Sequence, residues 1–201
     1  MSDFPIALHG ERIRAVIVGG GSVGTRKAMA LAAAGAQVTV ISPGVTPELE
    51  EAERRREITV TREPYRHDQI ERATVVIAAT DSRDVNAQIA VDAQKQGRLV
   101  NITDYPDEGN FHTMALHRSG DLTIAVSAGG LPGAAARIRD AIATRFDVRY
   151  GRALSALRGV RSRLIATGGE TWRAAAPKLI GEDFCDSVEN GSITEKVDSW
   201  R

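Results

Sequence analysis

The chain has 201 residues and a mass of 21.6 kDa, and its 26 basic residues balance its 26 acidic ones. A net charge of zero argues against a general nucleic-acid binder, which would carry a basic excess. No apolar run approaches the roughly 20 residues that cross a bilayer, the N-terminus lacks the pattern of a signal peptide, and the one cysteine, Cys185, excludes an intramolecular disulfide. We therefore expect a cytoplasmic protein with neither membrane nor nucleic-acid partners.

The first half of the chain alternates apolar, β-branched runs with helical patterns. Gly35 and Gly97 are suitable helix ends, and Thr46 before Pro47 is a suitable helix start. Strands separated by helices favour right-handed crossovers and a parallel sheet. The predicted strands are Arg14–Val18, Gln37–Ile41, Ile58–Thr61, Thr74–Ala79 and Leu99–Ile102, and the predicted helices are Val23–Ala34, one beginning at Pro47, and Asp84–Gln96.

The pattern changes after residue 110. Phe111–His117 and Leu122–Ser127 are strand-like runs that predict an antiparallel hairpin. A glycine-rich turn follows, and then two helical patterns cover Ala134–Phe146 and Arg152–Ile165. Residues 137–173 carry nine arginines against three acids, whereas the C-terminal tail is acidic. Solvated helix faces are the ordinary explanation of such charge runs.

The first predicted strand runs into a glycine motif, Gly19-x-Gly21-x-x-Gly24, that opens the first predicted helix. In the dinucleotide fingerprint the first glycine permits a tight turn, the second lets the backbone approach a pyrophosphate, and the third allows close packing of helix on strand. The N-terminus of the helix then offers free N–H groups to phosphate. The motif predicts a dinucleotide site in a Rossmann-type, doubly wound sheet.

The residue at the end of the second strand normally determines which cofactor binds. An acid there favours NAD, and an arginine favours NADP. This chain has Ser42, Pro43 and Gly44 there, so the local chemistry leaves the choice between NAD and NADP open.

Polar residues follow the fourth and fifth strands, at the edge where ligands bind in such sheets. Thr80 and Asp81 end the fourth strand, and Asp81 could contact the cofactor or cap the next helix. Asp104 follows the fifth strand, where a general base could stand or where it could serve only turn geometry.

Asn101, Asn110 and His112 border the loop around Asp104, and we expect them to contact the substrate. The histidines lack the mutual spacing of a metal site, and we predict no bound metal.

Five segments, in order and with suitable separations, resemble one family: Val16–Lys27 (VIVGGGSVGTRK), Val38–Pro43 (VTVISP), Ile77–Asn86 (IAATDSRDVN), Val100–Phe111 (VNITDYPDEGNF) and Leu122–Gly130 (LTIAVSAGG). Together they resemble the precorrin-2 dehydrogenases and the dehydrogenase/ferrochelatase module of the sirohaem synthases. The resemblance covers about residues 5–146.

The resemblance implies an α/β architecture in three parts: an NAD-binding Rossmann domain over residues 1–111, a dimerisation region of hairpin and helix over 112–147, and a helical C-terminal region with its acidic tail over 148–201. It implies a homodimer and an NAD-dependent oxidation of precorrin-2 to sirohydrochlorin. The family's catalytic aspartate falls on Asp104, and its cofactor contacts fall on Ser22, Val23, Pro43 and Gly44. Without a methyltransferase module, the chain is not expected to make precorrin-2 itself.

The implied substrate is a tetrapyrrole with eight carboxylates, and arginine forks match carboxylates well. Arg137, Arg139 and Arg145 are therefore candidate contacts to its rim. The chain departs from the family at Tyr105, where many relatives have a second aspartate, and at Met114, Ala128 and residues 131–133.

Three functions stay open. The first, which we favour, is a monofunctional dehydrogenase. The second is a bifunctional enzyme that also inserts iron, and the third is a non-catalytic NAD(H)-sensing module. The sequence leaves unresolved the inserted metal, the role of the tail after Gly181, and whether the product serves sirohaem or another tetrapyrrole.

Overall fold

The computed structural model describes residues 3–167 and 171–200. By its internal contacts the chain divides into two compact units, Met1–Thr113 and Met114–Arg201, which we call the N-terminal unit and the C-terminal unit. Each unit has hydrophobic clusters of its own. The three-part division expected from the sequence stays a prediction.

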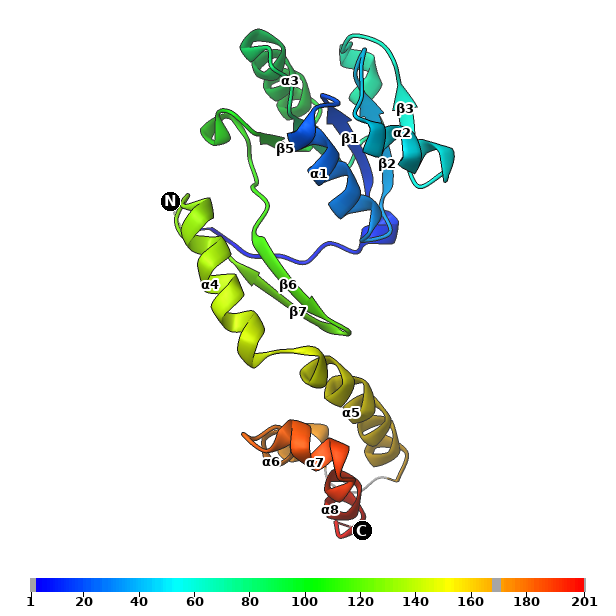
Figure 1. Ribbon diagram of the computed structural model, residues 1–201, viewed down its shortest axis with the longest axis vertical. Coiled ribbons are helices and arrows are strands. Elements are labelled where there is room, and N and C mark those ends of the chain that lie inside the picture. The colour runs from blue at the N-terminus through cyan, green and yellow to red at the C-terminus, as the bar shows by residue number, and fades with distance from the viewer. Residues whose placement is uncertain (1–2, 168–170, 201) are drawn as a thin grey trace. The chain divides into compact units, whose positions relative to one another are not determined.

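The N-terminal unit is built on a five-stranded parallel sheet in the order β3-β2-β1-β4-β5 (Figure 1). The strand order reverses between β1 and β4, so the predicted Rossmann-type, doubly wound fold is confirmed. The bounds are Arg14–Val18 (β1), Gln37–Ile41 (β2), Thr59–Thr61 (β3), Val75–Ala78 (β4) and Leu99–Ile102 (β5).

Alternating side chains of the strands enter two separate cores. In β1, Ala15 and Ile17 lie in the cluster that contains Ala28 of α1 and Leu49 of α2. The intervening β1 residues belong to the cluster on the other face, which contains residues of α3. Helices on both faces explain why the central strand β4 is apolar throughout. The bounds of the helices are Ser22–Ala32 (α1), Pro47–Arg54 (α2) and Arg83–Lys95 (α3), with short 3-10 turns at Gly10–Arg12 (η1), His67–Ile70 (η2) and Pro106–Glu108 (η3).

Local sequence signals explain where these helices begin. The Thr46 side chain accepts a hydrogen bond from the Leu49 amide at the start of α2, and Pro47 occupies the first helical position. The Ser82 side chain accepts one from the Val85 amide at the start of α3. The predicted start of α2 is confirmed.

The C-terminal unit begins with an antiparallel hairpin, β6 (Ala115–Ser119) and β7 (Leu122–Val126), and with helix α4 (Pro132–Arg145), which packs against it (Figure 1). The hairpin was predicted, but the prediction that its first strand covers Phe111–His117 is wrong at both ends. Phe111 instead lies beside β5, because its N–H donates to Val100 O at 3.4 Å and its carbonyl accepts from Asn101 Nδ2 at 3.2 Å. A two-residue loop with Gly120 at φ +54° joins the strands.

Within residues 148–167 and 171–200, the structure has four further helices: α5 (Val148–Thr167), α6 (Trp172–Leu179), α7 (Phe184–Glu189) and α8 (Ser192–Asp198). Phe184 lies at the centre of their shared core with none of its surface exposed, and its ring contacts Tyr150 edge-on at 5.5 Å between centroids. The described residues of the acidic tail after Gly181 are therefore folded against α5.

Candidate active site

Two of the three fingerprint glycines are required by close backbone contacts, and the third borders open space. Gly19 has φ +116°, and a Cβ there would lie 2.2 Å from the carbonyl oxygen of Ala79. A Cβ on Gly24 would lie 2.0 Å from the carbonyl oxygen of Gly19, so the glycine lets α1 pack closely on its own loop. A Cβ on Gly21 would meet no atom within 4 Å. Gly21 thus leaves open the face by which a ligand phosphate could approach the backbone.

The first turn of α1 follows this open face. The first hydrogen bond of the helix is donated by Thr25 N to Gly21 O at 2.9 Å, so the amides of Ser22, Val23 and Gly24 precede the helical ladder. Val23 is 39% exposed although it is apolar. Amides that precede the ladder and the positive end of a helix are suited to an anion, and the predicted phosphate site at this position stays a prediction.

The loop after β2 is fastened to the glycine loop. Thr46 N donates to Gly20 O at 3.1 Å, and Thr46 Oγ1 lies 2.8 Å from Thr25 Oγ1. The hydroxyl of Ser42 donates to Gly44 O at 2.7 Å, which turns the chain sharply around Pro43. Like Gly21, Gly44 is open to an added Cβ. The choice between NAD and NADP stays open at this loop.

The loop after β4 is held by a buried amide. Asn86 of α3 has none of its surface exposed; its Oδ1 accepts from Thr80 N at 3.2 Å and from Thr80 Oγ1 at 2.7 Å, and its Nδ2 donates to Thr80 O at 3.0 Å. Thr80 is therefore fixed beside Ala79, the residue against which Gly19 packs. Asp81 follows it and is exposed.

The segment after β5 carries the predicted catalytic carboxylate. Asp104 is exposed and lies two residues beyond the end of the strand. Asn101 is 5% exposed, and its Nδ2 donates to Phe111 O. Asn110 accepts from the amide of Val100 at 2.8 Å and donates to a backbone carbonyl just before β5 at 2.9 Å. Both asparagine side chains are thus engaged in holding this segment against the strand.

Because all five strands are parallel, the loops of Gly19–Gly24, Ser42–Gly44, Thr80–Asp81 and Asp104 emerge at the same edge of the sheet. His112 belongs to this unit too, with its Nε2 3.6 Å from Asp3 Oδ2. Arg137 and Arg139 lie on α4 in the C-terminal unit; Arg137 is exposed, and Arg139 pairs with Asp140 at 2.6 Å. The roles assigned to all these residues stay predictions.

Sequence reasoning missed an arginine beside Asp104. Arg83, the first residue of α3, forms an ion pair with Glu108, and its guanidinium lies 4.2 Å from the centroid of the Tyr105 ring. The hydrogen bond to Glu108 raises the pKa of Arg83, and the charges of Glu108 and Asp104 raise it further. Burial acts in the opposite direction. A contact across 25 residues leaves no local pattern, so only the fold reveals it.

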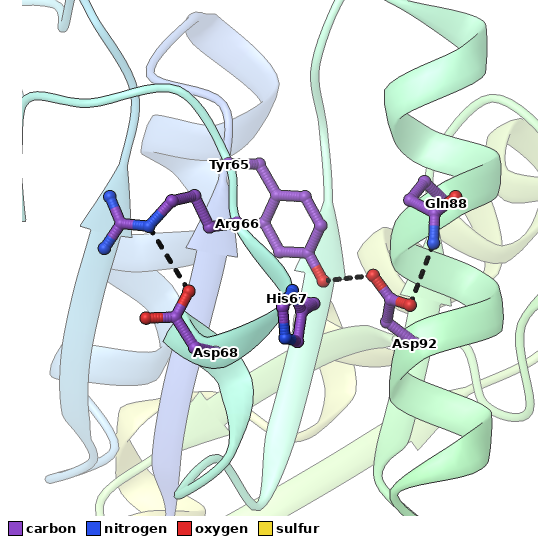
Figure 2. A pocket seen from close by; sticks show the side chains of 6 residues that line it. All are labelled: Tyr65, Arg66, His67, Asp68, Gln88 and Asp92. Atoms are coloured by element: carbon purple, nitrogen blue, oxygen red, sulfur yellow. Dashed lines mark hydrogen bonds and ion pairs between the residues drawn. The ribbon is translucent and has the colours of Figure 1, made fainter.

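A separate pocket of about 370 Å³ lies between η2 and α3 (Figure 2). In it, Tyr65 donates to Asp92 at 3.1 Å, and Gln88 donates to the other oxygen of the same carboxylate at 2.8 Å (Figure 2). Burial and this hydrogen bond raise the pKa of Tyr65. None of the predicted site residues lines this pocket.

Two absences hold for residues 3–167 and 171–200. Among those residues, no group of three His, Cys, Asp or Glu side chains is placed to hold a metal ion. Within the same residues, no helix combines the length and the apolarity that a membrane span requires.

Residues 6–115 match the model of a protein family described as "Putative NAD(P)-binding". The chain belongs to this NAD(P)-binding family. The match begins before η1 and ends in β6, and so it includes every loop at the candidate edge of the sheet.

Two similar proteins add a second comparison. The siroheme synthase of Chromobacterium violaceum is 35% identical over 153 residues, which are 76% of this chain and 33% of that protein. The siroheme synthase of Nitrosococcus oceani is 32% identical over 200 residues, which are 98% of this chain and 41% of that protein. The chain thus spans well under half of the length of these curated relatives, and the resemblance drawn from its motifs is confirmed.

The fold is also that of a solved structure, "SirC, precorrin-2 dehydrogenase", with a TM-score of 0.81. The alignment covers 98% of this chain and all of that one at 22% identity, so this likeness concerns the fold.

The residues at the sheet edge fit a dinucleotide. Gly21 leaves the space in which a side chain would otherwise stand, and the amides of Ser22, Val23 and Gly24 precede the helical ladder beside it. Gly44 provides a second open position on the neighbouring loop.

Proposed function

We propose that this protein oxidises precorrin-2 to sirohydrochlorin with NAD⁺ in tetrapyrrole biosynthesis. The observation that carries the proposal is the open glycine loop at the same sheet edge as Asp104. The names of the curated relatives, siroheme synthases, support the substrate and the pathway. The solved protein that shares this fold is named a precorrin-2 dehydrogenase, which supports the same reaction.

In this proposal, the amides of Ser22 and Val23 hold the pyrophosphate, and Gly21 lets it approach. NAD⁺, when bound, supplies the two-electron oxidant, so that precorrin-2 and NAD⁺ yield sirohydrochlorin, NADH and one proton. The Asp104 carboxylate accepts that proton from a ring carbon of the substrate. Its exposure leaves it accessible to a macrocycle at the edge of the sheet.

The substrate's carboxylates require cations. We propose Arg137 and Arg139 as contacts to them, with Arg145 on the same helix, because the guanidinium fork matches carboxylate geometry. Arg139 forms an ion pair with its neighbour Asp140. On binding, a carboxylate of the substrate would replace the Asp140 carboxylate as the partner of Arg139.

We also propose a homodimer formed through the hairpin region. Leu116 of β6 is 42% exposed, Ile138 of α4 is 47% exposed, and Leu131 before α4 is 64% exposed. All three belong to the hairpin, the helix α4 or the segment between them, and exposed apolar surface of this kind is typical of faces that a partner covers. Sedimentation velocity at micromolar concentration should give a dimer, and Leu116→Asp should shift it towards monomer. Val91→Asp, at an apolar residue of α3 that is 45% exposed, is the matched control.

The test of the activity is an anaerobic absorbance time course with fresh precorrin-2, with and without NAD⁺, against the spontaneous oxidation. We expect NAD⁺-dependent sirohydrochlorin with an equal amount of NADH; NADP⁺ in parallel measures the cofactor preference. Fe²⁺ added to the same cuvette then tests for chelation. NADH binding without turnover would instead favour the sensing module.

Asp104→Asn isolates the proposed base. The substitution keeps the size of the side chain and removes its basicity, so we expect kcat to fall by about 10²-fold or more, the range for loss of a general base. The affinity for NADH should stay within about twofold. Full activity in the variant would exclude the role of Asp104 as the base.

A further inference from the structure

Arg83 joins two loops at the sheet edge. It is the first residue of α3, directly after the loop of Thr80 and Ser82, and it reaches the segment that follows β5. That segment, residues 104–109, contains Asp104, Tyr105 and the short turn η3.

The contacts of Arg83 in this segment are of two kinds. Its Nη2 donates to Glu108 Oε1, and its guanidinium stacks on the ring of Tyr105 at 4.2 Å from the centroid. Cation–π contact with a guanidinium is favourable when the cation lies over the face of the ring. A second hydrogen bond joins α3 to the same turn: Gln94 Nε2 donates to Glu108 O at 2.8 Å.

The ion pair is made through one oxygen only. Arg83 Nη1 and Glu108 Oε2 are both buried, and neither has a hydrogen-bond partner among residues 3–167 and 171–200. Both side chains are more than a third exposed, so the ion pair itself adds little to stability. The groups that contact the guanidinium are Glu108 and Tyr105.

We propose that Arg83 is a positioning residue for Asp104: it holds the 104–109 segment on α3 through Glu108 and Tyr105, and so fixes where the Asp104 carboxylate lies. The ring of Tyr105 covers the cation. The kinetic part of this inference rests on the proposed function, whereas the anchoring part does not.

The anchoring is tested by hydrogen exchange of the full-length protein, read by mass spectrometry over peptides from residues 104–110. Arg83→Met removes the charge and the ion pair but keeps an unbranched side chain. We expect exchange in these peptides to accelerate by about tenfold or more, with other peptides of the sheet unchanged. Arg66→Met is the matched control, because Arg66 also pairs with acids, at η2, away from this loop. Unchanged exchange in Arg83→Met would overturn the anchoring.

The kinetic part is tested by the turnover of precorrin-2 with NAD⁺. Arg83→Met should lower kcat by about tenfold with KM for NAD⁺ unchanged, because Asp104 is no longer held in its place. Glu108→Gln, which removes the ion pair and keeps the size of the side chain, should lower kcat in the same direction. Arg83→Lys, which keeps the charge, should restore most of kcat. A general loss of structure would raise KM for NAD⁺ together with the fall in kcat and would not be rescued by lysine; an unchanged kcat in Arg83→Met would overturn the proposal.

The two failures are distinguishable. If the unsubstituted protein does not oxidise precorrin-2, the proposed function is wrong, and the exchange experiment still decides whether Arg83 anchors the segment.

Discussion

The two units of the chain hold their apolar side chains in different ways. In the N-terminal unit, the strands are the most deeply buried elements: Ile17 and Val40 have none of their surface exposed, and helices cover both faces of the sheet. In the C-terminal unit, the core lies among helices α5 to α8, whereas the β6–β7 hairpin alternates half-buried and exposed residues.

This difference separates two tasks. A five-stranded sheet with helices on both faces is complete by itself and can present rigid loops at one edge. A two-stranded hairpin is marginal until other elements pack on it, as α4 does here, and exposed Leu116 and Ile138 leave apolar surface that a second copy is suited to cover. We therefore assign cofactor binding to the N-terminal unit and propose that the C-terminal unit provides assembly and arginines for the substrate.

The largest expected effect tests whether the units fold independently. Phe184→Ala removes the most buried aromatic ring of the C-terminal unit. We expect the free energy of unfolding of that unit to fall by about 3–5 kcal/mol. Both tryptophans, Trp172 and Trp200, pack against this core, so their fluorescence in a urea titration reports this unit. NADH binding reports the other unit and should persist.

Phe4→Ala is the control, because Phe4 is 87% exposed. If Phe184→Ala abolishes NADH binding at the same urea concentration that unfolds the tryptophan core, the two units form one cooperative structure and the comparison fails.

The next effect is confined to the N-terminal unit. Gly21→Asp places a carboxylate in the open space beside the helix N-terminus, where it would exclude and repel a phosphate. We expect the Kd for NADH, measured by fluorescence titration, to rise by about 100-fold or more. Unfolding should be unchanged, since no atom lies within 4 Å of the added Cβ.

Gly159→Asp supplies the matched control on α5, where an added Cβ is equally unobstructed. It should leave NADH affinity unaltered. Normal binding by Gly21→Asp would mean that the fingerprint is a structural turn only.

Much of the N-terminal unit could be predicted because its signals are local. The bounds of β1, β2 and β5 follow from short apolar runs, and the start of α2 follows from Thr46 and Pro47. The predicted first strand of the hairpin was wrong because Phe111 is held by Val100 and Asn101, contacts that no local pattern reveals.

The candidate site was predictable only in part for the same reason. Glycine spacing indicates the loop, and chain position indicates Asp104. The pairing of Arg83 with Glu108 depends on how α3 lies against η3, and the pocket between Tyr65 and Asp92 depends on how η2 lies against α3. The proposed reaction comes from the motif resemblance, because neither composition nor spacing indicates it.

The smallest expected effect concerns a surface ion pair in the C-terminal unit. Arg149 of α5 donates to both carboxylate oxygens of Glu189 at 2.8 Å and also pairs with Asp186. The hydrogen bond from Arg149 lowers the pKa of Glu189 below its ordinary value of 4.5. A carboxyl whose pKa is lowered by folding stabilises the folded state above its unfolded pKa, and that contribution is lost as the pH falls through the folded value.

Arg149→Met should therefore lower the urea midpoint of the tryptophan signal slightly at pH 7, and the difference from the unsubstituted protein should shrink as the pH falls below about 4.5. Because the pair is exposed, about 1 M salt should reduce the difference at pH 7 as well. Arg173→Met, at an exposed arginine of α6, should shift neither midpoint. A difference that persists at low pH and high salt would show that Arg149 acts through the packing of its aliphatic stem. The charges between α5 and α7 would then contribute nothing measurable to the stability of the C-terminal unit.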